Sequence, residues 1–142
     1  MSDMLAAFLW GQLELCAEIK EKRKFVYEAY TAIIKDTALR HTVIPQGSDP
    51  SYHLFYVILP QGCDRMAVMS GMKDNGVQTA FHYVPLHTSP VGLSLGGKVG
   101  TLPVTEDLST RLLRLPLYPG LNADDVQKIT EVLMDALSKY SG

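Results

Sequence analysis

The sequence predicts an α+β fold, in which a long amino-terminal helix is followed by a small sheet with helices packed on one side. Three observations predict it: apolar residues recur at three- and four-residue steps near the start, short β-rich runs occupy the middle, and a second amphipathic pattern closes the chain. The 142 residues fit one compact unit, and a 46% apolar content is sufficient to build a core. We expect the long helix over residues 1–36 and a small α+β domain over residues 37–142.

The first helix is expected over residues 3–36 because its apolar side chains share one face. Ser2 or Asp3 can cap its first turn, since a short side-chain oxygen accepts from the free amides there. Gly11 is a weak point and indicates close packing against another element. The apolar positions are Leu5, Phe8, Leu9, Cys16, Ile19, Val26, Tyr30 and Ile33.

A strand–helix–strand unit is expected in the middle of the chain, after a loop over residues 45–50. Residues 52–59 are rich in aromatic and β-branched side chains, so we expect a well-buried strand that stops at Pro60. Asp64 can then cap a helix through residue 75, and a second strand follows over residues 77–83. The inner side of that helix is expected to carry Met66, Met69 and Met72.

The last third begins with residues 92–100, which hold four glycines without a period and are expected to form a mobile loop. A short helix opens near Thr105 and runs into Leu113. Residues 115–119 are extended, and Pro116 confines them to a sheet edge or an irregular strand. A final helix over residues 122–139 should dock on the sheet through Val126, Ile129, Leu133, Met134 and Leu137.

Composition excludes several classes of function. A formal charge of -2 with mixed signs gives no field that would attract nucleic acid. Cys16 and Cys63 form no disulfide framework, and we expect reduced, buried thiols. No apolar run approaches the roughly 18 residues of a membrane span, and no leader pattern opens the chain. We therefore expect a cytoplasmic protein without membrane or nucleic-acid partners.

The candidate binding residues are His82, Tyr83 and His87, which lie at the end of an apolar run that prolines stop. A strand ending at residues 82–83 would put those two side chains on opposite faces. Pro85 then turns the chain and presents His87. Imidazole and phenol groups both donate and accept hydrogen bonds, which suits the hydroxyls of a sugar or the oxygens of a phosphate. The same histidines could equally be structural, and the residues alone leave this open.

Other kinds of site are less well supported by the sequence. No carboxylate lies near the histidines, and their spacing across a proline turn is not a metal-ligand pattern, so we expect no metal site. No Gly-x-Ser-x-Gly elbow is present, which disfavours a serine hydrolase. His41 and His53 are expected to be structural, and Lys98 is expected to be a solvated loop residue.

Four sequence blocks carry a family resemblance. They are MSDMLAAFLWGQL at residues 1–13, YHLFY at 52–56, FHYVPLH at 81–87 and LLRLPLY at 112–118. In this order and spacing they resemble the carboxy-terminal part of DegT/DnrJ/StrS-type aminotransferases, which act on nucleotide-linked 4-keto-6-deoxy sugars and use pyridoxal phosphate. The resemblance covers essentially the whole chain.

The resemblance implies the small carboxy-terminal domain, with the connecting helix, of a fold-type I enzyme that works as a homodimer. It implies that His82, Tyr83 and, less directly, His87 bind the sugar-nucleotide substrate. The residues that hold the cofactor in the family, a Schiff-base lysine and an aspartate beside the pyridine nitrogen, lie upstream of the matching region. The chain alone is therefore expected to have no catalytic or cofactor-binding residues and to need a large amino-terminal domain. A stand-alone binding or dimerisation module with the same fold is the alternative.

Overall fold

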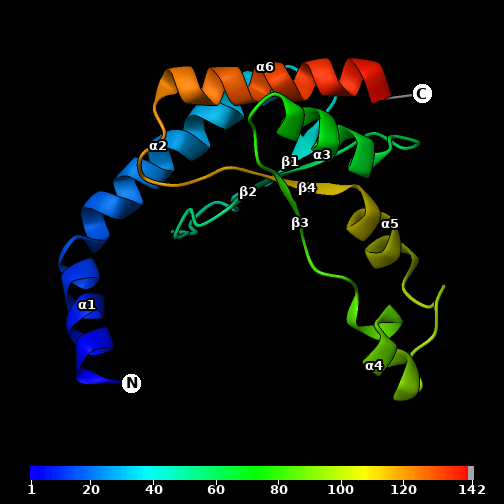
Figure 1. Cartoon of the computed structure of the whole chain (residues 1–142), viewed down its shortest axis with the longest axis horizontal. Coiled ribbons are helices and arrows are strands. Elements are labelled where there is room, and N and C mark those ends of the chain that lie inside the picture. Colours follow the sequence, from blue (N-terminus) through cyan, green and yellow to red (C-terminus); the bar gives the residue numbers. More distant parts are fainter. Residues whose placement is uncertain (141–142) are drawn as a thin grey trace.

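The computed structural model describes residues 1–140 and confirms the α+β class. Within these residues the strands form one four-stranded sheet in the order β1-β2-β4-β3, and neighbouring strands are antiparallel. The helices α2, α3 and α6 cover one face of this sheet (Figure 1). None of the described helices combines the length and apolar character that a membrane crossing requires.

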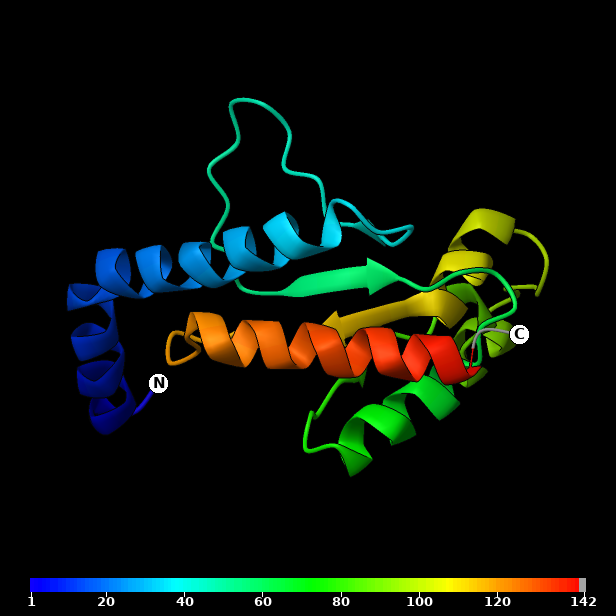
Figure 2. The same cartoon turned by 90° about the horizontal axis from the view of Figure 1, so that it is seen from above.

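The amino-terminal segment forms two helices rather than the single expected helix. They are α1 (Asp3–Glu14) and α2 (Cys16–Ile34), and they meet at an angle (Figure 2). Leu15 leaves the helical conformation between them, with φ -96° and ψ 6°. Ser2 caps α1 by accepting from the Leu5 amide, as expected. No side chain of α1 is buried, so packing does not hold α1 in line with α2, and Gly11 approaches no other element.

The buried face of the sheet comes from strands β2 (Phe55–Ile58) and β4 (Leu112–Leu115). Phe55 pairs with Leu115 and Val57 with Leu113, and all four side chains point into the core because alternate residues of a strand share a face. Tyr30 of α2 stacks on Phe55 at 4.9 Å between ring centroids. The other strands, β1 (Arg40–His41) and β3 (Ala80–Phe81), are two-residue edges.

Strand β4 corrects one sequence prediction. It lies between β2 and β3, inside the sheet, and it begins directly after α5 (Pro103–Arg111). The helix was expected to run into Leu113, but Leu112 and Leu113 already belong to the strand. The run over residues 115–119 was expected at a sheet edge or as an irregular strand; only Leu115 of it lies in β4, and Pro116 follows the last strand residue and removes no ladder hydrogen bond. The expected strands over 52–59 and 77–83 are present but shorter, as β2 and β3.

Helices α3 (Arg65–Asp74) and α6 (Ala123–Tyr140) confirm the capping predictions. Asp64 accepts from two amides of the first turn of α3, and Asn122 accepts from the amide of Asp125. Two expected core methionines are wrong: Met66 is 64% exposed and Met134 is 39% exposed. Met66 lies on the solvent side of α3, near the exposed Ser70 and Lys73, whereas Met134 lies at the border of the apolar face of α6.

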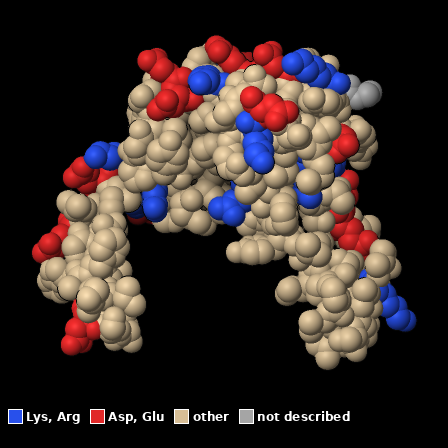
Figure 3. All heavy atoms as spheres, viewed as in Figure 1, with Lys and Arg blue, Asp and Glu red and all other residues tan. Residues whose placement is uncertain are grey.

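The mobile loop expected over residues 92–100 overlaps the end of a short helix, α4 (Pro90–Ser94), which follows a 3₁₀ turn, η1 (Leu86–Thr88). Ser89 caps α4 by accepting from the Gly92 amide, and Pro90 supplies a preset first helical residue. Together with the start of α5, this segment forms an arm that projects from the sheet opposite α1 (Figure 1). The space-filling view is hollowed between α1 and this arm, and their facing sides carry few charged groups (Figure 3).

Candidate functional site

The segment after β3 carries the predicted site residues. Strand β3 ends at Phe81, so the two-residue alternation does not extend to His82 and Tyr83. Their rings lie 4.7 Å apart in an edge-on contact, which corrects the expectation that they face opposite sides. Tyr83 is 79% exposed, whereas His82 is half-buried. The structure therefore places these two side chains together.

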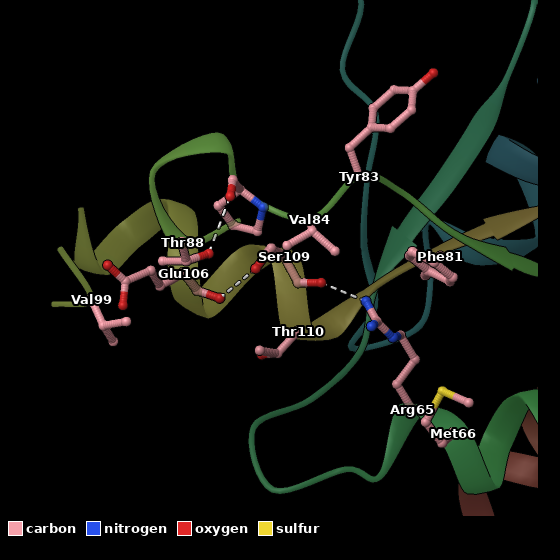
Figure 4. A pocket seen from close by; sticks show the side chains of 11 residues that line it. Arg65, Met66, Phe81, Tyr83, Val84, Thr88, Val99, Glu106, Ser109 and Thr110 are labelled. Carbon is pink, nitrogen blue, oxygen red and sulfur yellow. Dashed lines mark hydrogen bonds between the residues drawn. The ribbon is translucent and has the colours of Figure 1, made fainter. Parts of the chain in front are cut away.

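A cavity of about 550 Å³ lies beside this segment, and we call it the β3–α5 cavity (Figure 4). The start of α3, the residues after β3 and one side of α5 form its walls. Tyr83 is part of the lining, but His82 and His87 are not. The lining residues are Arg65, Met66, Phe81, Tyr83, Val84, Pro85, Thr88, Val99, Glu106, Ser109 and Thr110.

His87 lies in the 3₁₀ turn and contacts Glu106 of α5. Its Nε2 is 2.9 Å from Glu106 Oε1, and both side chains are largely shielded from solvent. The carboxylate of Glu106 also accepts from the amide of Gly100 at 2.8 Å and from that of Leu102 at 3.3 Å. Glu106 therefore joins the 3₁₀ turn, the glycine-rich segment and α5.

These contacts change the acidity of Glu106. The hydrogen bond from His87, followed by that from the Gly100 amide, lowers the pKa of Glu106 below its usual range. The carboxylate is thus held in its charged form, in which it accepts all of these hydrogen bonds. His87 Nε2 is occupied by its contact with Glu106. His87 could therefore contact a substrate only through its other ring atoms.

Arg65 forms the opposite wall of the cavity. Its Nη1 donates to the carbonyl of Ser109, and also to that of Leu112 at 3.2 Å. Its Cζ lies 5.5 Å from the centroid of the Phe81 ring, in cation–π range. Burial lowers the pKa of Arg65. The guanidinium remains charged, because even a lowered arginine pKa lies far above neutrality.

The remaining histidines and cysteines form no further site. His41 stacks on Phe55 at 5.9 Å between centroids, and His53 lies at the surface 3.0 Å from the Ser51 hydroxyl. Cys16 is exposed and Cys63 is half-buried, so the expectation of a buried thiol is wrong for Cys16, because it begins α2 at the unpacked bend. Among residues 1–140, no three potential ligands cluster as a metal site would require.

Sequence reasoning missed Arg65 and Glu106. Nothing in the local pattern of Arg65 distinguishes it from a surface residue of a first helical turn. Glu106 lies in the first turn of α5, where an acidic residue is ordinary. Their contacts reach back 19 residues to His87 and forward 44 residues to Ser109, so only the fold reveals them.

Known proteins share this arrangement of helices and sheet. The solved aminotransferase TlmJ of Streptoalloteichus hindustanus superposes with a TM-score of 0.78 at 28% identity, over 90% of this chain and 34% of that one. The fold is thus that of about a third of an aminotransferase of this type. The sequence profile of the DegT/DnrJ/EryC1/StrS aminotransferase family matches residues 1–134, and the chain belongs to that family.

Two curated relatives are similar over nearly the whole chain. The pleiotropic regulatory protein of Geobacillus stearothermophilus is 29% identical over 95% of this chain and 37% of its own length. The dTDP-4-dehydro-2,3,6-trideoxy-D-glucose 4-aminotransferase of Saccharopolyspora spinosa is 28% identical over 98% of this chain and 35% of its own length. The chain therefore spans about a third of the length of these relatives.

The family uses pyridoxal phosphate, and the lining of the β3–α5 cavity does not fit that cofactor. Its aldehyde needs a lysine in a shielded site. No lysine lines the β3–α5 cavity. Lys20 and Lys22 are engaged at the surface with Asp49 and Glu18, and the contact with Asp49 raises the pKa of Lys20, which disfavours a free amine.

Proposed function

We propose that this chain is the carboxy-terminal domain of a pyridoxal-phosphate-dependent sugar-nucleotide aminotransferase. The intact protein would convert a dTDP-4-keto-6-deoxy sugar to the 4-amino sugar, with glutamate as amino donor. One observation carries the proposal: the family profile matches residues 1–134, while the relatives continue for about twice that length beyond the matched part. The Saccharopolyspora relative is named as an aminotransferase of a dTDP-linked 4-keto sugar, which supports this substrate class.

The particular activity that we propose is that of a dTDP-4-amino-4,6-dideoxygalactose transaminase of surface polysaccharide synthesis. The motifs FHYVPLH at 81–87 and LLRLPLY at 112–118 support this choice by resemblance. Residues 1–36 would form the connecting helical segment, and residues 37–142 the small domain. We further propose that the intact enzyme is a homodimer, in which α1 is covered by the large domain or the second subunit.

We propose that His82, Tyr83 and His87 contact the sugar nucleotide. Tyr83 lies on the wall of the β3–α5 cavity with its phenol exposed, and the His82 ring lies against it. Both can bond to hydroxyl or phosphate oxygens. In the intact enzyme, His82→Ala and Tyr83→Phe should raise the KM for the sugar nucleotide and leave the absorbance of the bound cofactor unchanged. Equal loss of cofactor would contradict a role on the substrate side.

The cofactor supplies the electron sink of the reaction, and its lysine is proposed to come from the missing part of the protein. Incubation of this chain with pyridoxal phosphate and borohydride tests this directly. We expect no stoichiometric label on any single lysine, and only diffuse labelling of exposed amines. A single, fully labelled lysine would place the chemistry in this chain.

The alternative is a non-catalytic binding or dimerisation module with the same fold. The hydrophobic core favours the module. The helices α2, α3 and α6 and the sheet bury their apolar faces on one another, and this core includes no residue of another segment as large as a domain. The non-enzymatic name of the Geobacillus relative is compatible with it. The two functions are separated by the full-length protein: a lysine-bearing domain with transaminase turnover supports the enzyme, and its absence supports the module.

A further inference from the structure

One edge of the Arg65 guanidinium has no acceptor. Its Nη1 is engaged with the carbonyls of Ser109 and Leu112. The buried Nε has no hydrogen-bond partner within residues 1–140, and no bond from Nη2 is formed within that range either. A shielded, charged donor without an acceptor is unfavourable. An acceptor from outside the described residues would satisfy this edge, and it would reach the shielded Nε only after neighbouring side chains shift.

The free edge has the geometry of an anion fork. Nε and Nη2 donate in parallel from the same side of the planar group, which matches two oxygens of a carboxylate or phosphate. The two carbonyls that hold Nη1 fix the plane of the guanidinium in advance. Binding an oxyanion therefore requires little further ordering of this long side chain.

The other polar groups of the cavity do not compete for this role. The hydroxyls of Thr88, Ser109 and Thr110 each donate to a backbone carbonyl three residues earlier. Glu106 is on the far side of the cavity from Arg65 (Figure 4). Its carboxylate is engaged with His87 and the Gly100 amide. Arg65 is thus the one cationic side chain in the lining.

Apolar side chains lie near the guanidinium. The Phe81 ring lies 5.5 Å from its Cζ, and Met66 and Val84 also line the cavity (Figure 4). At about 550 Å³, the cavity is within the range of sites that hold small organic ligands. A ligand that fits must join an oxyanion to an apolar body.

We propose that Arg65 makes the β3–α5 cavity a binding site for such an organic anion. The oxyanion bonds to Nε and Nη2, and the apolar part lies against Phe81 and Val84. The choice of ligand rests on the proposed function, which offers two sources of the same chemistry: the phosphate of the sugar nucleotide and the carboxylate of the amino donor. Arg65 then recognises a reactant, in addition to holding the end of α5.

Nuclear magnetic resonance on the chain itself tests this proposal, because nitrogen-15 labelling makes the Arg65 Nε–H directly visible. The probes are dTMP, inorganic phosphate and L-glutamate. We expect saturable shifts of the Nε–H signal and of the Phe81 and Thr110 amides, with affinity in the millimolar range. Arg65→Gln should weaken binding by at least about tenfold, as expected for loss of a bidentate charged contact. Arg40→Gln, a change on the exposed edge strand β1, should leave binding unchanged.

Arg65→Lys is a control for the case in which Arg65→Gln loses binding because the chain unfolds. It keeps a cation and a donor for the α5 carbonyls, so the α5 amide signals should persist while the fork, and with it most of the binding, is lost. Shifts with dTMP alone assign the phosphate source, and shifts with glutamate alone assign the carboxylate source. No shift with any probe, or equal binding by Arg65→Gln, overturns the proposal. Neither result affects the proposed function, whose tests use the intact enzyme and its cofactor.

Discussion

The packed body of the molecule and its first helix both carry large apolar side chains, but the body buries them and the helix exposes them. In the body, α2, α3 and α6 bury residues such as Tyr30, Met72 and Leu133 against the sheet. In α1, Phe8 is 71% exposed and Trp10 is 67% exposed. Apolar surface is stabilising only when another surface removes it from water. The comparison indicates that the body covers its own core, whereas the apolar side chains of α1 have no such cover within residues 1–140.

The arm around α4 resembles α1 in this respect. Leu86 and Leu95 are 85% and 82% exposed, and neither α4 nor α5 has a buried residue. The arm differs from α1 in being tied internally, through Glu106 to His87 and Gly100. Exposed apolar patches of this kind mark interaction surfaces. Both surfaces border the hollow seen in Figure 3, which is where the proposed remainder of the enzyme would dock.

Truncation of a buried side chain in the body should give the largest change in the free energy of unfolding. Leu133 is fully buried, so Leu133→Ala should lower the free energy of unfolding by about 2–5 kcal/mol. The matched change Phe8→Ala in α1 should alter it by less than about 0.5 kcal/mol. Urea denaturation followed by circular dichroism measures both values. Similar losses for the two variants would show that α1 packs on the body.

Removal of a helix cap should lower the stability of the body by a smaller amount than core truncation does, and should leave the stability unchanged when the cap belongs to α1. Asp64 accepts from two amides of α3, so Asp64→Ala should destabilise the chain by about 1 kcal/mol. Ser2→Ala removes the corresponding cap of α1 and should leave the unfolding midpoint unchanged, because α1 is not part of the cooperative unit. A clear shift of the midpoint for Ser2→Ala would be evidence against this division.

Acidification should loosen the arm before the body. The pKa of Glu106 is lowered below 4.5 in the folded chain, so its stabilising effect is present above pH 4.5 and is lost as pH falls through the folded value. Hydrogen exchange at the Gly100 amide should therefore accelerate on acidification, relative to its intrinsic rate, while α6 stays protected. Glu106→Gln should abolish this pH dependence. If Gly100 protection in that variant still falls with acid, another group holds the arm.

The sequence predicted the body better than the site. Short-range signals located the caps at Asp64 and Asn122, and apolar periodicity located most of the core. Such signals act over a few residues, whereas the break at Leu15 depends on the absence of packing partners for α1. The interior place of β4 likewise depends on pairing with β2, more than 50 residues away.

The site was predicted only in part, for a related reason. The motif at residues 81–87 drew attention to Tyr83, which does line the cavity. The side-by-side arrangement of His82 and Tyr83 was not foreseen, because the strand ends at Phe81, two residues before the end that its composition indicates. Arg65 and Glu106 reach the site through long-range contacts that no local pattern records.

Hydrogen exchange of α1, in this chain and in the full-length protein that would contain it, tests most directly whether this is one domain of a larger enzyme. A lone helix of this length is marginal in water. We expect the α1 amides of the chain to exchange close to unprotected rates, and in the full-length protein to become as protected as those of α6. Equal, strong protection of α1 in the chain alone, or continued rapid exchange in the full-length protein, would contradict the account.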